Sequence, residues 1–117
     1  MSLGDAQREF SYHMGCLLVH IGVTPNHACT FGDAYRDPRV HGEHGEKKSY
    51  SSANSDHKLK LAVDLNLFID GTYRTDTEAH RPFGDYWKAL SPHNYWGGDI
   101  LDEHGNPDGN HYGRIYT

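Results

Sequence analysis

The chain has 117 residues, which suits one domain spanning residues 1–117 and is short for two domains of ordinary size. A net charge of −5 and the absence of any run of Lys or Arg argue against nucleic acid as a partner. No apolar stretch approaches the roughly 20 residues of a membrane span, and the N-terminus lacks the basic and apolar regions of a signal peptide. We therefore expect synthesis in the cytoplasm and no membrane insertion, while the sequence leaves the oligomeric state open.

Histidine is the residue type that departs most from ordinary composition. The chain has ten histidines, against the roughly two or three expected at this length. Such enrichment is typical of metal or proton chemistry. The two cysteines, Cys16 and Cys29, form no Cys-x-x-Cys pair, so a thiolate zinc knuckle is not predicted and both are interpreted as ordinary thiols.

The N-terminal segment has the periodicity of an amphipathic helix over about residues 5–21. Its apolar positions recur four, three, one and three residues apart, which places them on one helical face: Phe10, Met14, Leu17, Leu18 and Ile21. Gly22 and Pro25 are expected to end this helix. His13 and His20 lie on it seven residues apart, and we interpret both as surface residues.

Residues 30–56 are rich in Gly, Ser, Asp, His and Lys and predict a long ordered loop. Within it, His41 and His44 are three residues apart, which would be a ligand spacing on a helix. The glycines beside them disfavour a helix, so we expect both histidines on the surface.

Strict alternation of apolar and polar residues over 59–67 predicts a strand with one buried face. The apolar side consists of Leu59, Leu61, Val63, Leu65 and Leu67, and the polar side of Lys60, Ala62, Asp64 and Asn66. Asp64 projects beside the small Ala62, which leaves space over its carboxylate. His57 has the opposite parity, so the chain must leave strand geometry before Leu59 if His57 is to meet Asp64.

A hairpin and a second helix are expected next. Asp70-Gly71 predicts the turn and residues 72–74 the return strand. A helix capped by Thr75 or Thr77 should follow, starting late or broken because of Pro82-Phe83-Gly84. The expected fold class is α+β, with a small antiparallel sheet flanked by helices.

Four polar residues carry the candidate chemistry. His111 begins a last short strand, expected over 111–116, and Asp108 lies three residues before it in a Gly-rich loop. Two imidazoles and one carboxylate, from His57, His111 and Asp64, with a fourth position left open, are typical of catalytic zinc. Asp108 could then move a proton between the attacking water and the leaving amine.

Three segments of the chain carry a family resemblance. The segment 55–64 (Ser-Asp-His-Lys-Leu-Lys-Leu-Ala-Val-Asp) is similar to a Ser-x-His-x-x-Gly-x-Ala-x-Asp signature, with Lys60 in place of the glycine. Residues 96–99 (Trp-Gly-Gly-Asp) and 108–111 (Asp-Gly-Asn-His) follow in the same order as in that family. The chain thus resembles, over about residues 30–116, the D-alanyl-D-alanine carboxypeptidases and phage L-alanyl-D-glutamate endopeptidases, zinc peptidases of the lysostaphin-like and hedgehog-like folds.

This resemblance implies residue roles and a substrate. The implied Zn²⁺ ligands are His57, Asp64 and His111. Asp108 would be the general base, and Arg36, with Arg39 as the alternative, would hold the substrate carboxylate or the developing oxyanion. The implied substrate is the stem peptide of bacterial peptidoglycan, cut at L-Ala-D-Glu or D-Ala-D-Ala. The tryptophan-glycine-glycine segment favours a phage or prophage enzyme that acts on the cell wall after release.

Two other functional classes stay open at the level of sequence. A non-catalytic zinc-binding module would keep the fold and the metal but not the reaction. A His-rich nuclease is suggested by the pairs Asp56-His57, His93-Asn94 and Asn110-His111. Nucleases of that type usually have a basic surface and often cysteine pairs, and this sequence has neither.

Overall fold

A five-stranded antiparallel sheet forms the centre of the structure, a computed structural model that describes residues 1–35, 37–47, 55–102 and 104–116. Its strands are β1 (His27–Phe31), β2 (Ala62–Ile69), β3 (Thr72–Arg74), β4 (Asn94–Trp96) and β5 (His111–Arg114). The order is β1-β2-β5-β4, and β3 also pairs with β2. β2 is therefore the central strand, with β1 along one edge and with β5 and β3 on the other.

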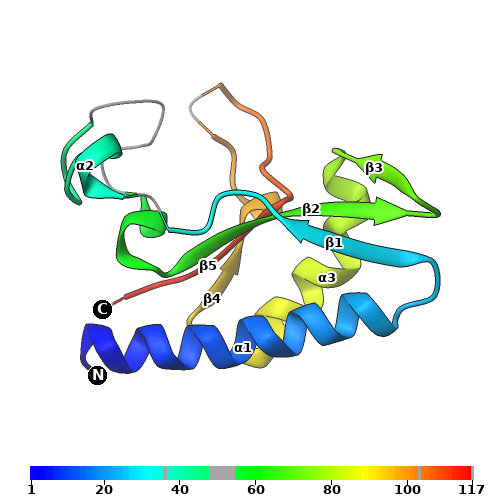
Figure 1. Ribbon diagram of the computed structural model, residues 1–117, viewed down its shortest axis with the longest axis horizontal. Coiled ribbons are helices and arrows are strands. Elements are labelled where there is room, and N and C mark those ends of the chain that lie inside the picture. Colours follow the sequence, from blue (N-terminus) through cyan, green and yellow to red (C-terminus); the bar gives the residue numbers. More distant parts are fainter. Residues whose placement is uncertain (36, 48–54, 103, 117) are drawn as a thin grey trace.

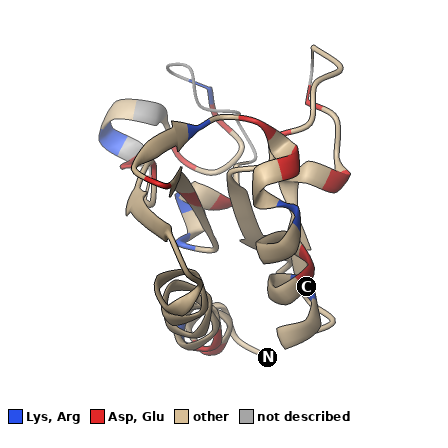
Figure 2. Cartoon of the chain, turned by 90° about the vertical axis from the view of Figure 1, so that its right-hand side faces the viewer, with Lys and Arg blue, Asp and Glu red and all other residues tan. Residues whose placement is uncertain are grey.

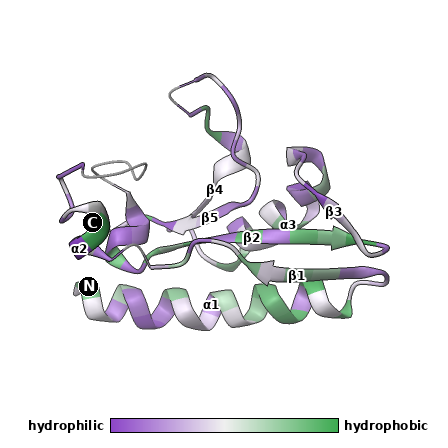
Figure 3. Ribbon diagram, turned by 45° about the horizontal axis from the view of Figure 1, so that its top comes forward, coloured by the Kyte–Doolittle hydropathy of each residue, from purple (hydrophilic) through white to green (hydrophobic). Residues whose placement is uncertain are grey.

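Two long helices pack on one face of this sheet: α1 (Leu3–Val23) and α3 (Thr77–Leu90). Figure 1 shows α1 running beneath β1 and β2. The second half of α1 is the more hydrophobic half, as Figure 3 shows. A short helix α2 (Pro38–His41) and two 3-10 turns, η1 (Asp56–Leu59) and η2 (Gly97–Asp99), complete the described elements. No described helix combines the length and apolarity that a membrane span requires.

The hydrophobic core lies between the helices and the sheet. It joins one face of α1, the odd-numbered side of β2 with the preceding leucine, α3, and one aromatic residue each from β4 and β5. Its members are Ala6, Phe10, Met14, Leu17, Ile21, Leu61, Val63, Leu65, Leu67, Phe83, Trp87, Trp96 and Tyr112. Because alternate residues of a strand face opposite sides, Asp64 and His111 lie on the face away from this core. The predicted α+β class with an antiparallel sheet flanked by helices is confirmed.

Several predicted boundaries need correction. The N-terminal helix is confirmed and is longer than 5–21, because Ser2 and Asp5 form a capping box at its start. Residues 30 and 31 belong to β1, and α2 includes His41, so the prediction of a loop throughout 30–56 is wrong at both places. The side chain of His41 lies outside the described part, while His44 is exposed as predicted.

The second half of the chain differs from prediction in its helix and its last strand. The Asp70-Gly71 turn is confirmed, with φ of +52° and +77° at the two residues. α3 is capped by Asp76, not by Thr75 or Thr77, and it continues unbroken through Pro82. β5 ends at Arg114, two residues before the predicted end. Both cysteines are free thiols.

The two helical histidines are less exposed than predicted. His13 and His20 are each partly buried. The ring of His20 stacks on Tyr86 of α3, with centroids 4.0 Å apart, and His13 lies edge-on to Trp87. Both histidines therefore contribute to the packing of α1 against α3. The periodicity of residues 5–21 alone does not reveal these contacts, because the partner residues lie on another helix.

Candidate metal centre

The side chains of His57, Asp64 and His111 meet at one point on the open face of the sheet. His57 Nε2 lies 3.2 Å from His111 Nδ1 and 3.2 Å from Asp64 Oδ1. His111 Nδ1 lies 3.2 Å from the same carboxylate oxygen. In a tetrahedral zinc site with bonds of about 2.0–2.1 Å, neighbouring ligand atoms are about 3.3 Å apart. The three atoms thus have the spacing of one face of a zinc tetrahedron, and this group could hold a metal ion.

The outward nitrogens of both imidazoles have hydrogen-bond partners. His57 Nδ1 lies 2.8 Å from the carbonyl oxygen of Ala34, which can only accept, so Nδ1 carries the proton. The Tyr95 hydroxyl donates to Asp56 at 2.6 Å and accepts from His111 Nε2 at 3.0 Å. In these tautomers each ring presents an unprotonated nitrogen to the centre. Three converging acceptors are favourable only around a cation, which is the arrangement typical of metal-binding histidines.

η1 is the local structure that brings His57 to this point. Ser55 caps the turn by accepting from the His57 amide, and Lys60 ends it in the left-handed region at φ +58°. The chain thus leaves strand geometry before Leu59, as predicted, and β2 begins only at Ala62. The signature glycine corresponds to Lys60, and a left-handed position is where glycine is most favourable. The Lys60 side chain is exposed and extends over the Tyr35 ring, so it does not line the candidate site.

Strand pairing places the other two ligands. Asp64 of β2 and His111 of β5 are direct cross-strand partners, so both side chains stand on the same face of the sheet. His57 is almost completely buried, at 1% exposure, whereas the side chains of Asp64 and His111 keep 16% and 17% exposure. The centre is therefore held rigidly on one side and open to solvent on the other, as a catalytic metal site requires.

Asp108 is placed beside His111 by a tight turn. The His111 amide donates to the carbonyl of Asp108 at 3.1 Å, and the Asp108 amide donates to the carbonyl of Gly97 at 3.1 Å. Trp96 holds the same loop through a 2.6 Å hydrogen bond from its indole N–H to the carbonyl of Gly109. The tryptophan-glycine segment and the Asp-x-x-His segment thus form one structural unit.

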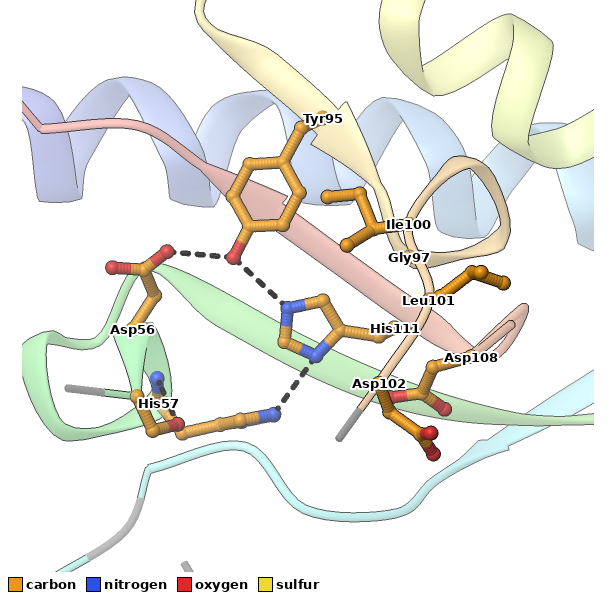
Figure 4. A pocket seen from close by; sticks show the side chains of 10 residues that line it. Asp56, His57, Tyr95, Gly97, Ile100, Leu101, Asp102, Asp108 and His111 are labelled. Carbon is orange, nitrogen blue, oxygen red and sulfur yellow. Dashed lines mark hydrogen bonds between the residues drawn. The ribbon is translucent and has the colours of Figure 1, made fainter. Parts of the chain in front are cut away.

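A pocket of about 460 Å³ opens next to the centre. Its lining includes His57, His111, Tyr95 and Asp108, and Figure 4 shows Ile100 beside Tyr95 and Leu101 beside Asp108. Ile100 and Leu101 are exposed at 51% and 65%, so they form an apolar rim. The described lining residues include aspartates and no Lys or Arg.

The pKa values of Asp64 and Asp108 are shifted in opposite directions. Burial by itself raises the pKa of Asp64, but the interactions with His111 and His57 outweigh it and leave the pKa well below the usual range. Partial burial and the negative charge of Asp64 raise the pKa of Asp108. The lowered pKa of Asp64 favours its charged form, while the raised pKa of Asp108 is better matched to accepting and returning a proton.

The predicted site residues have different outcomes. His57, Asp64 and His111 come together, and Asp108 lines the same pocket. Arg36 lies outside the described residues. Arg39 is exposed and pairs with Asp37 through a hydrogen bond of 2.6 Å.

The sequence predicts no specific role for two residues at the centre. Any of the eight tyrosines could line a cleft, so the sequence does not single out Tyr95, and Asp56 appears only in the nuclease-like pair Asp56-His57. Their contact spans 39 residues of sequence. No periodicity or spacing within the chain could have indicated it, because it depends on the pairing of β4 with β5.

Comparisons with known proteins identify no family: no protein-family model matches the chain, and no curated protein matches it.

Proposed function

We propose that the chain is a zinc-dependent peptidase that cuts the stem peptides of bacterial peptidoglycan. The observation that carries the proposal is the convergence of His57 Nε2, His111 Nδ1 and Asp64 Oδ1 at mutual distances of 3.2 Å beside an open pocket. Two histidines, one carboxylate and an accessible fourth position form the donor set of catalytic zinc. A bound zinc ion would supply polarisation of the scissile carbonyl and of the attacking water.

Asp108 is the proposed general base. It lines the pocket next to His111, and its raised pKa suits a group that takes a proton from water and gives it to the leaving amine. His57 is buried and Asp64 lies 3.2 Å from both histidine nitrogens, so neither residue has such freedom. This separates the proposed roles: the three converging residues hold the metal, and Asp108 moves the proton.

The substrate class follows from the resemblance of residues 55–64, 96–99 and 108–111 to the peptidoglycan peptidases. The apolar rim of Ile100 and Leu101 fits the small methyl side chains of alanine in a stem peptide. An L-Ala-D-Glu endopeptidase of phage or prophage type, acting on the wall after release, is the form we propose first. A D-Ala-D-Ala carboxypeptidase is its nearest alternative.

The pocket is less suited to nucleic acid. Aspartates line it, and a phosphodiester would be repelled by them. Figure 2 shows no continuous basic stripe on the part of the chain that is coloured by charge. A non-catalytic zinc-binding module shares the metal centre with the proposed enzyme, so only a reaction assay separates those two functions.

The test measures metal content and peptidoglycan cleavage together. We expect about one zinc per chain, bound by the three converging residues. Purified peptidoglycan should then release new amino termini, and mass spectrometry of the fragments identifies the bond. His111→Ala should lose both metal and cleavage, while His44→Ala, which alters an exposed histidine, should keep both.

Asp108→Asn separates the enzyme from the binding module. It should retain zinc and lose cleavage by on the order of 10²–10⁴-fold, because only the proton transfer is removed. Asp85→Asn, at an exposed position of α3, is the matched control. A zinc-loaded wild-type chain that releases no amino termini would support the binding module, and a chain that binds no zinc would contradict both.

A further inference from the structure

Tyr95 connects His111 to a carboxylate that is not itself a metal ligand. The Tyr95 hydroxyl donates to Asp56 Oδ2 at 2.6 Å and accepts from His111 Nε2 at 3.0 Å. Figure 4 shows the three side chains in line, with His57 on the far side of the His111 ring. The chain of contacts thus runs from Asp56, which precedes His57 in η1, through Tyr95 of β4 to His111 of β5.

The direction of these hydrogen bonds is fixed by chemistry. An ionised carboxylate only accepts, so the Tyr95 hydroxyl proton points to Asp56. The hydroxyl oxygen can then only accept from His111, which requires the proton of that ring to be on Nε2. The remaining His111 nitrogen, Nδ1, lies 3.2 Å from Asp64 Oδ1 and is the ring nitrogen available to a metal ion.

The sheet is shaped to admit the Tyr95 ring at this place. Tyr95 is the cross-strand partner of Gly113, which in turn pairs with Ala62. A Cβ at Gly113 would lie 2.3 Å from Cζ of Tyr95 and 2.4 Å from its hydroxyl oxygen. The ring therefore lies directly over the glycine. Two small residues in this row let a large aromatic side chain reach His111, which is two residues before Gly113 on the same face of β5.

We infer that Tyr95 and Asp56 are positioning residues that hold the His111 ring in one tautomer, with Nδ1 directed to the metal. This inference rests on the metal centre of the proposed function. His57 receives the equivalent support from a backbone carbonyl, that of Ala34. The two ligands are thus oriented by different means, and only the support of His111 depends on side chains. Hydrogen-bonded partners of this kind raise the basicity of a ligand and fix its orientation.

The first arm of the test uses the metal-free protein. Ring-nitrogen NMR, recorded above the ordinary pKa range of histidine, reports which nitrogen of His111 carries the proton. We expect Nε2–H in the wild-type chain and a mixture of the two tautomers in Tyr95→Phe. Tyr73→Phe removes an exposed tyrosine hydroxyl on β3 and should leave His111 unchanged. If the metal-free wild type and Tyr95→Phe have the same mixture of His111 tautomers, the inference is wrong.

The second arm measures affinity for zinc by competition with a chelator, and the absorption spectrum of the cobalt-substituted protein. Tyr95→Phe should weaken zinc binding on the order of 10–100-fold and alter the cobalt spectrum. Asp56→Asn should have a smaller effect, because an amide oxygen can still accept from Tyr95. The double variant should be no weaker than Tyr95→Phe, since both residues act through one hydroxyl.

The two arms separate the inference from the proposed function. If the wild-type chain binds no zinc, the proposed function fails, while the NMR result still decides whether Tyr95 orients His111. If the wild type binds zinc and Tyr95→Phe binds it equally with the same cobalt spectrum, the inference is wrong and the metal centre stands. Equal thermal unfolding of the metal-free wild type and Tyr95→Phe shows that a weaker affinity is not a consequence of misfolding.

Discussion

Gly97 and Asp108 approach so closely that no side chain fits between them. A Cβ built at Gly97 would lie 2.3 Å from the carbonyl oxygen of Asp108 and 2.8 Å from Cβ of His111. The first of these atoms belongs to the backbone and cannot rotate away. The glycine after Trp96 is thus a geometric requirement of the loop that carries both the proposed base and a proposed ligand.

Gly97→Ala should therefore damage the centre. The turn from Asp108 to His111 has to shift, so we expect a loss of zinc affinity on the order of 10-fold or more, because ligand orientation controls affinity. Competition with a chelator measures the change. Gly15→Ala is the control, because a Cβ there meets nothing within 4 Å. It should keep the wild-type affinity, and since alanine favours a helix interior, it should raise the free energy of unfolding by about 0.5–1 kcal/mol. Wild-type affinity in Gly97→Ala would contradict the proposed role of the loop.

Gly113→Ala should weaken zinc binding in the same way as Tyr95→Phe, although it changes none of the proposed ligands. The new methyl group would occupy the space of the Tyr95 ring, so the hydroxyl should move away from His111 Nε2. We expect weaker zinc binding and a mixed His111 tautomer by ring-nitrogen NMR. In Gly22→Ala, where the added Cβ meets nothing, neither observable should change. An unaltered His111 signal in a folded Gly113→Ala protein would contradict this prediction, because it would show that the Tyr95 ring keeps its contact with His111.

His80 should make the stability of the metal-free chain depend on pH. Burial lowers the pKa of His80 to about 4, whereas the pKa of histidine in the unfolded chain is about 6.5. As the pH falls, the unfolded state therefore binds this proton at a higher pH than the folded state does. Between these values the unfolded state holds more protons, and the free energy of unfolding must fall as the pH falls. The contribution of His80 should decrease by about 2 kcal/mol between about pH 7.5 and about pH 5.

Urea unfolding of wild type and His80→Gln at several pH values measures this difference. His80→Gln lacks the titrating group and should be less stable overall, because the hydrogen bond between His80 and Tyr112 is disturbed. Its stability should nevertheless fall less between the two pH values than that of the wild type. His93→Gln, at an exposed position, should follow the wild-type curve. Parallel curves for wild type and His80→Gln would show that His80 is not the group responsible.

The capping box of α1 should affect stability and not the metal centre. The Ser2 side chain accepts from the Asp5 amide, and Asp5 accepts from the Ser2 amide. Ser2→Ala removes one of these bonds and should lower the free energy of unfolding by about 1 kcal/mol. Ser11→Ala, on the exposed side of the same helix, should cause no loss. Zinc affinity should equal that of the wild type in both variants, because α1 lies on the opposite face of the sheet.

Local patterns in the sequence predicted the parts of the fold that local physics governs. The helical spacing from Phe10 to Ile21, the alternation around Asp64 and the Asp70-Gly71 turn all have their counterpart in the structure. β1 and β4 were not predicted, because each is short and is stabilised by its partner strand rather than by its own pattern.

The sequence by itself determined the fold class and the residue types of the candidate centre, because hydrophobic periodicity and ligand chemistry are properties of the chain. It identified His57, Asp64, His111 and Asp108 as residues to consider together. Only the tertiary structure decided that three of them meet at 3.2 Å, since this depends on the pairing of β2 with β5 and on the turn of η1. It also decided the hydrogen-bond partner of His111, because Tyr95 and Asp56 come together only when β4 joins the sheet.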